Sequence, residues 1–151
     1  MNLFDKVLNY LYLPVAVIIT AVFLITNGLA AWLELIYLVL GLLFGWFLIS
    51  VYLGLLKNPK ISIIFSSAIF QVGFLLFSFW VITSNESLVA SGIVLGINIF
   101  FVRDLVFDYQ KRRTILKKKL FNNPETSDRL VLVYLASFIL LVALLAFFVI
   151  F

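Results

Sequence analysis

Residues 88–121 read LVASGIVLGINIFFVRDLVFDYQKRRTILKKKLF, and this stretch decides how the chain is organised. Its first 15 residues are mostly apolar and end where Arg103 and Asp104 interrupt them. A helix needs about 20 mostly apolar residues to cross the roughly 30 Å hydrocarbon core of a membrane. The run therefore spans a membrane if it continues to Phe107, with the two charges near the headgroups. The alternative is a re-entrant segment.

Four further stretches are long and apolar enough to span a membrane, at about 7–26, 30–56, 61–82 and 130–151. Unbroken apolar runs do not suit the strands of membrane barrels, which alternate every second residue, so all five segments are predicted to be helices. Turn-forming residues separate them, for example Asn58-Pro59. We therefore expect one all-α integral membrane domain over residues 1–151, a bundle of five transmembrane helices with the fourth at 88–107.

The composition supports a membrane protein over a soluble one. The 151 residues are 65% hydrophobic and 12% charged, whereas a soluble domain is about 45–50% apolar and about 25% charged. The absence of Cys and His excludes disulfides and Cys or His metal sites. The first apolar stretch exceeds the 7–15 residues of a signal-peptide core, so we expect it to be retained. Few Arg beside many Phe, Ile, Lys and Asn residues favour a prokaryotic cytoplasmic membrane.

Lys and Arg residues predict the orientation of the bundle. With five spans, all eleven cations lie on one side of the membrane, and the other side carries only Glu34 and Glu86. Because Lys and Arg accumulate in cytoplasmic loops, the N-terminus is predicted to be cytoplasmic and the C-terminus to lie outside. Residues 108–129 then form a cytoplasmic connection. Aromatic residues suited to the interfaces are Tyr109 and Tyr134 inside, and Trp32 and Trp80 outside.

The segment Lys111–Lys119 holds six cations in nine residues. Ile115, Leu116, Leu120 and Phe121 lie near one another on its helical wheel, which predicts a basic surface helix extending the fourth span. The candidate contacts to anionic lipid headgroups are Lys111, Arg112, Arg113, Lys117, Lys118 and Lys119. The simpler interpretation is a topological anchor. Nothing beyond charge indicates nucleic acid as a partner.

Three ionisable residues, Arg103, Asp104 and Asp108, interrupt the fourth span, and such residues at membrane depth are functional candidates. Asp108 can pair with Lys111 or Arg112 one turn on. Asp104 has no such neighbour, so its expected partner is a cation of another segment: Lys60, Lys57 or Lys6. The two carboxylates share one helix face, which suits Mg²⁺ or phosphate chemistry. The structural alternative is an ion pair that orients the bundle.

Gln71 and Asn98 are the amides expected nearest the bilayer midplane. The two residues lie equally far from the predicted turn between the third and fourth helices. We therefore expect them to hydrogen-bond to each other across the hairpin, with backbone carbonyls as the alternative partners. Gly92 and Gly96 point away from Asn98, so they should pack against another helix, such as the Gly41–Gly45 seam or the Ala136 and Ala143 face.

The sequence predicts no catalytic, metal-binding or cofactor-binding residue, and without His or Cys it offers few nucleophile–base pairs. The leading hypothesis is a non-enzymatic accessory or assembly subunit of a membrane complex, with the lipid bilayer, other membrane subunits or a second copy as partners. The first alternative is a small transporter or channel that uses Glu34, Gln71, Asn98 and Asp104. The second alternative is a lipid-modifying enzyme that uses Asp104 and Asp108.

Overall fold

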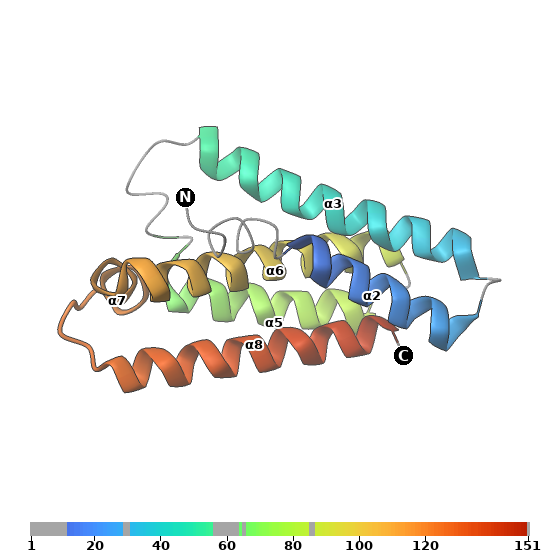
Figure 1. The fold of residues 1–151 in the computed structure, drawn as a ribbon. Helices are drawn as coiled ribbons and strands as arrows, with labels where there is room; N and C mark the ends of the chain where they lie inside the picture. Colours follow the sequence, from blue (N-terminus) through green and yellow to red (C-terminus); the bar gives the residue numbers. More distant parts are fainter. Residues whose placement is uncertain (1–11, 29–30, 56–63, 65, 85–86, 151) are drawn as a thin grey trace.

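The computed structural model describes residues 12–28, 31–55, 64, 66–84 and 87–150. Within these residues all regular secondary structure is helical, which confirms the all-α part of the predicted fold class. The helices are α2 (Tyr12–Asn27), α3 (Trp32–Leu55), α5 (Ala68–Ser84), α6 (Leu88–Lys111), α7 (Arg113–Phe121) and α8 (Asp128–Ile150). All but α7 run lengthwise along one bundle (Figure 1).

Three of the described helices are long and apolar enough to cross a membrane: Trp32–Val51 within α3, α6 and α8. The described parts of α2 and α5 are apolar but shorter, with 16 and 17 residues. Helix α6 continues unbroken through Arg103 and Asp104 for 24 residues, which is about 36 Å at 1.5 Å per residue. Its length therefore fits a full span, and the charged pair does not end the helix.

The bundle is built around α6, which contacts α3, α5 and α8. The closest contact joins α3 to α6, because glycines face each other across it. A Cβ added to Gly41 would lie 3.0 Å from the Cα of Gly92, and one added to Gly92 would lie 2.5 Å from the backbone oxygen of Leu38. Gly45 and Gly96 continue the same contact. The predicted packing of Gly92 and Gly96 against the Gly41–Gly45 seam is confirmed.

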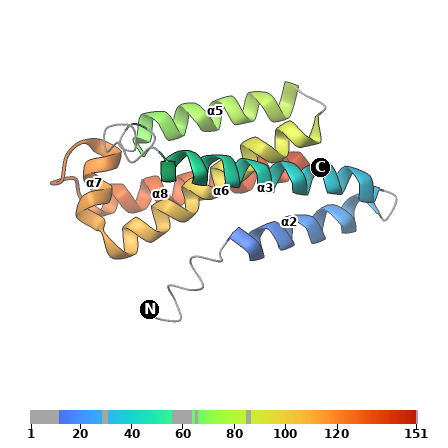
Figure 2. The ribbon, with the colours of Figure 1, turned by 90° about the horizontal axis from the view of Figure 1, so that it is seen from above.

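Helix α7 does not extend α6, contrary to the prediction for the basic segment. Helix α6 ends at Lys111. The backbone of Arg112 (φ −144°, ψ 49°) leaves the helical region, and a separate helix starts at Arg113. Figures 1 and 2 show α7 running across one end of the bundle. Leu116 and Leu120 of α7 are buried against the bundle, whereas Ile115 is 48% exposed. The buried face of α7 is therefore narrower than the four-residue apolar face that the sequence predicts.

The end of the bundle opposite α7 carries the α2–α3 connection and the C-terminal end of α8 (Figure 1). Trp32 and Trp80 are both exposed, with Trp32 starting α3 and Trp80 near the end of α5. At this end the side-chain amide of Asn27 donates a hydrogen bond to the carbonyl of Ile150 over 3.2 Å. This bond links α2 to α8.

Candidate functional site

The buried amide of Asn98 joins α6 to α5. Its nitrogen donates to the hydroxyl of Ser78 over 2.7 Å and to the carbonyl of Val94 over 2.8 Å. The Ser78 hydroxyl donates in turn to the carbonyl of Phe74 over 2.8 Å. Asn98 and Ser78 are both fully buried. The amide oxygen of Asn98 has no hydrogen-bond partner in the described structure, so this contact is only half satisfied.

Gln71 is also buried, but its partner lies on another helix. Its side-chain oxygen accepts a hydrogen bond from the hydroxyl of Tyr134 in α8 over 2.9 Å. The predicted bond between Gln71 and Asn98 is therefore wrong. Side chains lean toward the N-terminus of their own helix, so on two antiparallel helices they lean toward opposite ends. Gln71 reaches the α7 end and meets Tyr134, and Asn98 reaches the other way and meets Ser78.

Tyr134 was expected at the inner interface as a member of the aromatic belt. Its ring lies between Phe121 of α7 and Phe138 of α8, at centroid distances of 5.9 and 6.0 Å. The tyrosine therefore joins three helices: α7 and α8 through its ring, and α5 through its bond to Gln71. The prediction missed this role, because hydropathy alone does not show which side of α8 faces the bundle.

Asp108 forms the most buried ion pair of the described residues. Its carboxylate lies 2.5 Å from the ammonium of Lys119, and the two side chains are 5% and 22% exposed. The predicted local pairing with Lys111 or Arg112 is therefore replaced by a pairing eleven residues along the chain. The cause is the break at Arg112, because α7 turns back and its last turn brings Lys119 over α6. The ion pair thus holds α7 on the end of the bundle.

Asp104 lies one turn before Asp108 and is half-buried. The charges that act on it include Lys119, Asp108, Arg103 and Arg112. Its predicted partners, Lys60, Lys57 and Lys6, lie outside the described residues. The guanidinium of Arg103 lies 5.9 Å from the ring centroid of Phe100. In the described part of the chain, no three acidic side chains gather to hold a metal ion, and the Asp104–Asp108 face instead meets Lys119.

Glu34 lies at the opposite end of the bundle, exposed in the first turn of α3. It borders a shallow depression with Tyr37, Ser87 and Leu88, where α6 begins. The structure thus separates the four residues of the transport hypothesis. Gln71 and Asn98 each bond a neighbouring helix inside the bundle, and Glu34 and Asp104 lie near opposite ends of α3 and α6.

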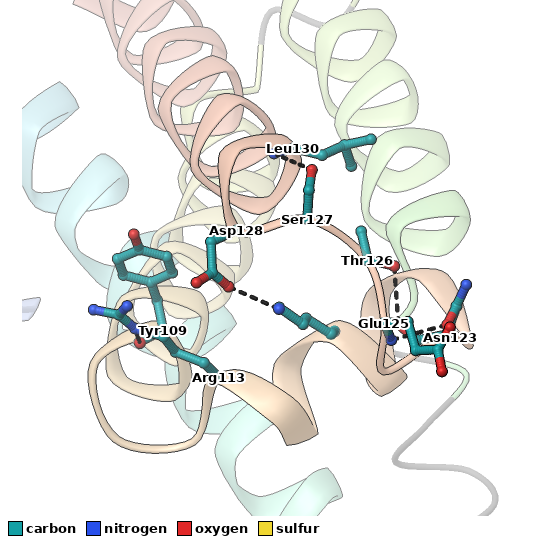
Figure 3. A network of polar contacts seen from close by, with 9 residues as sticks. Tyr109, Arg113, Asn123, Glu125, Thr126, Ser127, Asp128 and Leu130 are labelled. Atoms are coloured by element: carbon teal, nitrogen blue, oxygen red, sulfur yellow. Dashed lines mark hydrogen bonds and ion pairs between the residues drawn. The ribbon is translucent and has the colours of Figure 1, made fainter.

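The six predicted headgroup contacts fall into two groups. Lys119 pairs with Asp108, and Lys117 pairs with Asp128 over 2.8 Å. The other four residues are exposed: Lys111, Arg112, Arg113 and Lys118. Figure 3 shows Asp128 at the start of α8, with its dashed ion pair to α7, and the stacked pair of Tyr109 and Arg113 beside it. Two of the six cations therefore act as structural ties.

The turn that returns the chain from α7 to α8 is held by its own side chains (Figure 3). Asn122 adopts a left-handed backbone (φ 53°) that ends α7. The side chain of Asn123 accepts from the backbone of Glu125 over 2.9 Å, and the hydroxyl of Thr126 donates to the carbonyl of Asn123 over 2.9 Å. The hydroxyl of Ser127 accepts from the backbone of Leu130 over 3.3 Å. The turn therefore sets where α8 starts.

A groove of about 420 Å³ lies between α2, α6 and α8. Its walls are apolar throughout and include Ile19 and Val22 of α2, Ile99 of α6, and Ala143 and Ala146 of α8. The alanines widen the groove on the α8 side, since larger side chains there would fill it. The groove could not be predicted from the sequence, because three separate helices form it.

Comparison of this chain with protein-family models, with curated proteins and with solved structures found no match.

Proposed function

We propose that the chain is a five-span bundle with a cytoplasmic N-terminus and an external C-terminus, embedded in a prokaryotic cytoplasmic membrane. Three helices of spanning length and the lengthwise arrangement of α2 and α5 beside them support this topology. The distribution of charge supports the orientation. Helix α7 and the adjoining ends of α6 and α8 carry most of the described cations, and the opposite end carries Glu34.

We further propose that the protein is a non-enzymatic accessory or assembly subunit of a membrane complex. The observation that carries this proposal is the use of the polar side chains inside the bundle. Asn98 bonds Ser78, Gln71 bonds Tyr134, and Asp108 pairs with Lys119, so these three candidate residues each tie one helix to another. Such ties build a scaffold. They also employ Gln71 and Asn98, which the transport alternative would need, and Asp108, which the enzyme alternative would need.

The apolar groove between α2, α6 and α8 supplies the surface for a partner. Membrane helices associate by close packing, and small residues allow their backbones to approach. Ala143 and Ala146 give the α8 wall that property. We propose that the groove receives one transmembrane helix of another subunit. A second copy of the chain would be the occupant if the complex proves to be a homo-oligomer.

The proposal is tested by purifying the protein with its partners in a mild detergent and identifying them by mass spectrometry. Ala143→Phe fills the groove, whereas Leu140→Phe adds a ring at a 68% exposed position of α8 that does not line the groove. We expect a partner in fixed stoichiometry with the wild type and with Leu140→Phe, and its loss with Ala143→Phe. Purification of the wild type alone, or equal retention by both variants, would contradict the proposal.

A further inference from the structure

The exposed cations of the basic segment cluster where α6 turns into α7. Lys111 ends α6, Arg112 forms the break, and Arg113 starts α7, so three consecutive cations occupy one corner of the bundle. All three are exposed. We call Lys111–Arg113 the corner cations. They differ from Lys117 and Lys119, which hold α7 to Asp128 and Asp108.

The length of α6 places this corner in the headgroup layer. The helix is about 36 Å long, and the hydrocarbon core is roughly 30 Å thick. Its first residue, Leu88, lies beside Ser87 and the exposed carboxylate of Glu34, which mark the polar boundary at the other end. From that boundary α6 crosses the whole core, and its last turn emerges beyond it. Lys111 and its neighbours therefore lie level with lipid phosphates.

Arg113 is held in an orientation that suits a phosphate. Its Nε donates to the carbonyl of Tyr109 over 3.1 Å, and its guanidinium carbon lies 4.8 Å from the centroid of the Tyr109 ring. The ammonium of Lys111 lies 5.1 Å from the ring centroid of Phe107 in the same way. A guanidinium presents its donors as a planar fork that matches phosphate oxygens. The ring contact fixes this fork before any ligand arrives.

Lys118 is a cation of the same basic segment that lies away from the corner cations. It lies about 160–200° around α7 from Leu116 and Leu120, the two residues buried against the bundle. Lys118 therefore lies on the side of α7 turned away from the bundle, and α7 runs across the end of the bundle (Figure 2). Lys118 and Arg112 carry the same charge and are both exposed. They differ in position, since Arg112 lies at the break between α6 and α7 and Lys118 in the last turn of α7.

We propose that the corner cations bind the phosphate of anionic phospholipids in the leaflet on the α7 side of the membrane. Arg112 and Arg113 supply the donors for the phosphate oxygens, and Lys111 adds a charge beside them. The ligand is a lipid headgroup and not a free ion, because the site lies at the rim of the bundle at headgroup depth. This assignment does not depend on the accessory role proposed above.

The experiment measures phospholipid binding to the purified protein in detergent by native mass spectrometry. The probes are phosphatidylglycerol, phosphatidylcholine and inorganic phosphate. The variants are Arg112→Gln, Arg112→Lys and the matched control Lys118→Gln. A surface cation near anionic lipid contributes about fivefold in affinity. We expect phosphatidylglycerol to bind more tightly than phosphatidylcholine, Arg112→Gln to weaken phosphatidylglycerol binding about fivefold, Arg112→Lys to restore most of it, and Lys118→Gln to change it by less than twofold.

Three results would overturn the proposal. Equal affinity of the wild type for the two lipids would show that no anionic site exists. Equal weakening by Arg112→Gln and Lys118→Gln would show that overall charge attracts the lipid and that the corner does not. Displacement of phosphatidylglycerol by an equal concentration of inorganic phosphate would show a site for free anions. The melting temperature of each variant, measured beside the wild type, confirms that the variants compared are folded.

Discussion

Gly92 lacks a Cβ atom, and this absence allows α6 to pack closely against α3. A Cβ there would lie 2.5 Å from the backbone oxygen of Leu38, and neither atom can move without shifting its helix. We expect Gly92→Ala to lower the free energy of unfolding by about 1–3 kcal/mol, the usual cost of overpacking. Thermal unfolding in detergent measures it. Gly73→Ala is the matched control, because nothing lies within 4 Å of a Cβ at Gly73 in α5. A similar loss of unfolding free energy in both variants would show that the close contact at Gly92 does not determine stability.

Replacement of Asn98, unlike that of Gly92, is not expected to lower the stability of the protein. Its amide oxygen is buried without a partner, and Ser78 keeps its bond to the carbonyl of Phe74 when Asn98 is replaced. Loss of a hydrogen bond is costly when it leaves a buried group unsatisfied, and here the Ser78 hydroxyl stays bonded while the unpartnered Asn98 oxygen is removed. We therefore expect Asn98→Leu to leave the melting temperature in detergent unchanged or to raise it. A fall equivalent to more than about 1 kcal/mol would show that the amide supplies net stability.

At the scale of the helices, the two lysine ties of α7 should differ in energy. Lys119→Met leaves Asp108 buried without its cation, and breaking a fully buried pair costs roughly 3–5 kcal/mol. The loss here should be smaller than that, because Lys119 is 22% exposed. Lys117→Met is the control and should lower stability by clearly less, since Asp128 is 57% exposed and solvent screens exposed ion pairs. The free energies of unfolding are measured by chemical denaturation. Equal losses in Lys119→Met and Lys117→Met would contradict the conclusion that the Asp108–Lys119 pair is the more buried one.

The helices and the glycine seam were predictable from the sequence, whereas the polar partners were not. Apolar run lengths predicted α6 and α8 to within a few residues, because hydropathy reports burial in lipid. The angle between Gly92 and Asn98 on the helical wheel predicted that they face different neighbours, which the structure confirms. The break at Arg112 was missed, since no glycine or proline marks it. Asp108 and Lys119 come together only because of that break.

For the whole molecule, the five-span topology predicts which loops share a compartment. The native chain has no cysteine, so single cysteines report their own position. Asn58→Cys and Glu125→Cys should react with an impermeant thiol reagent from the cytoplasmic side, and Asn27→Cys from the outer side. Intact cells compared with inverted membrane vesicles distinguish the sides. Reaction of Asn58→Cys and Glu125→Cys from opposite sides would exclude five spans.

The direct contact of α3 with α6 also determines how the molecule can deform. Side chains that interlock can change rotamer and let two helices slide, but the seam brings backbone against backbone at Gly41, Gly92 and Gly96. Sliding there would drive Cα atoms into carbonyl oxygens. We therefore expect α3 and α6 to move together as one rigid unit. We therefore expect relative motion within the bundle to involve the helices outside this pair, of which α2 and α8 are joined at one end by the hydrogen bond from Asn27 to Ile150.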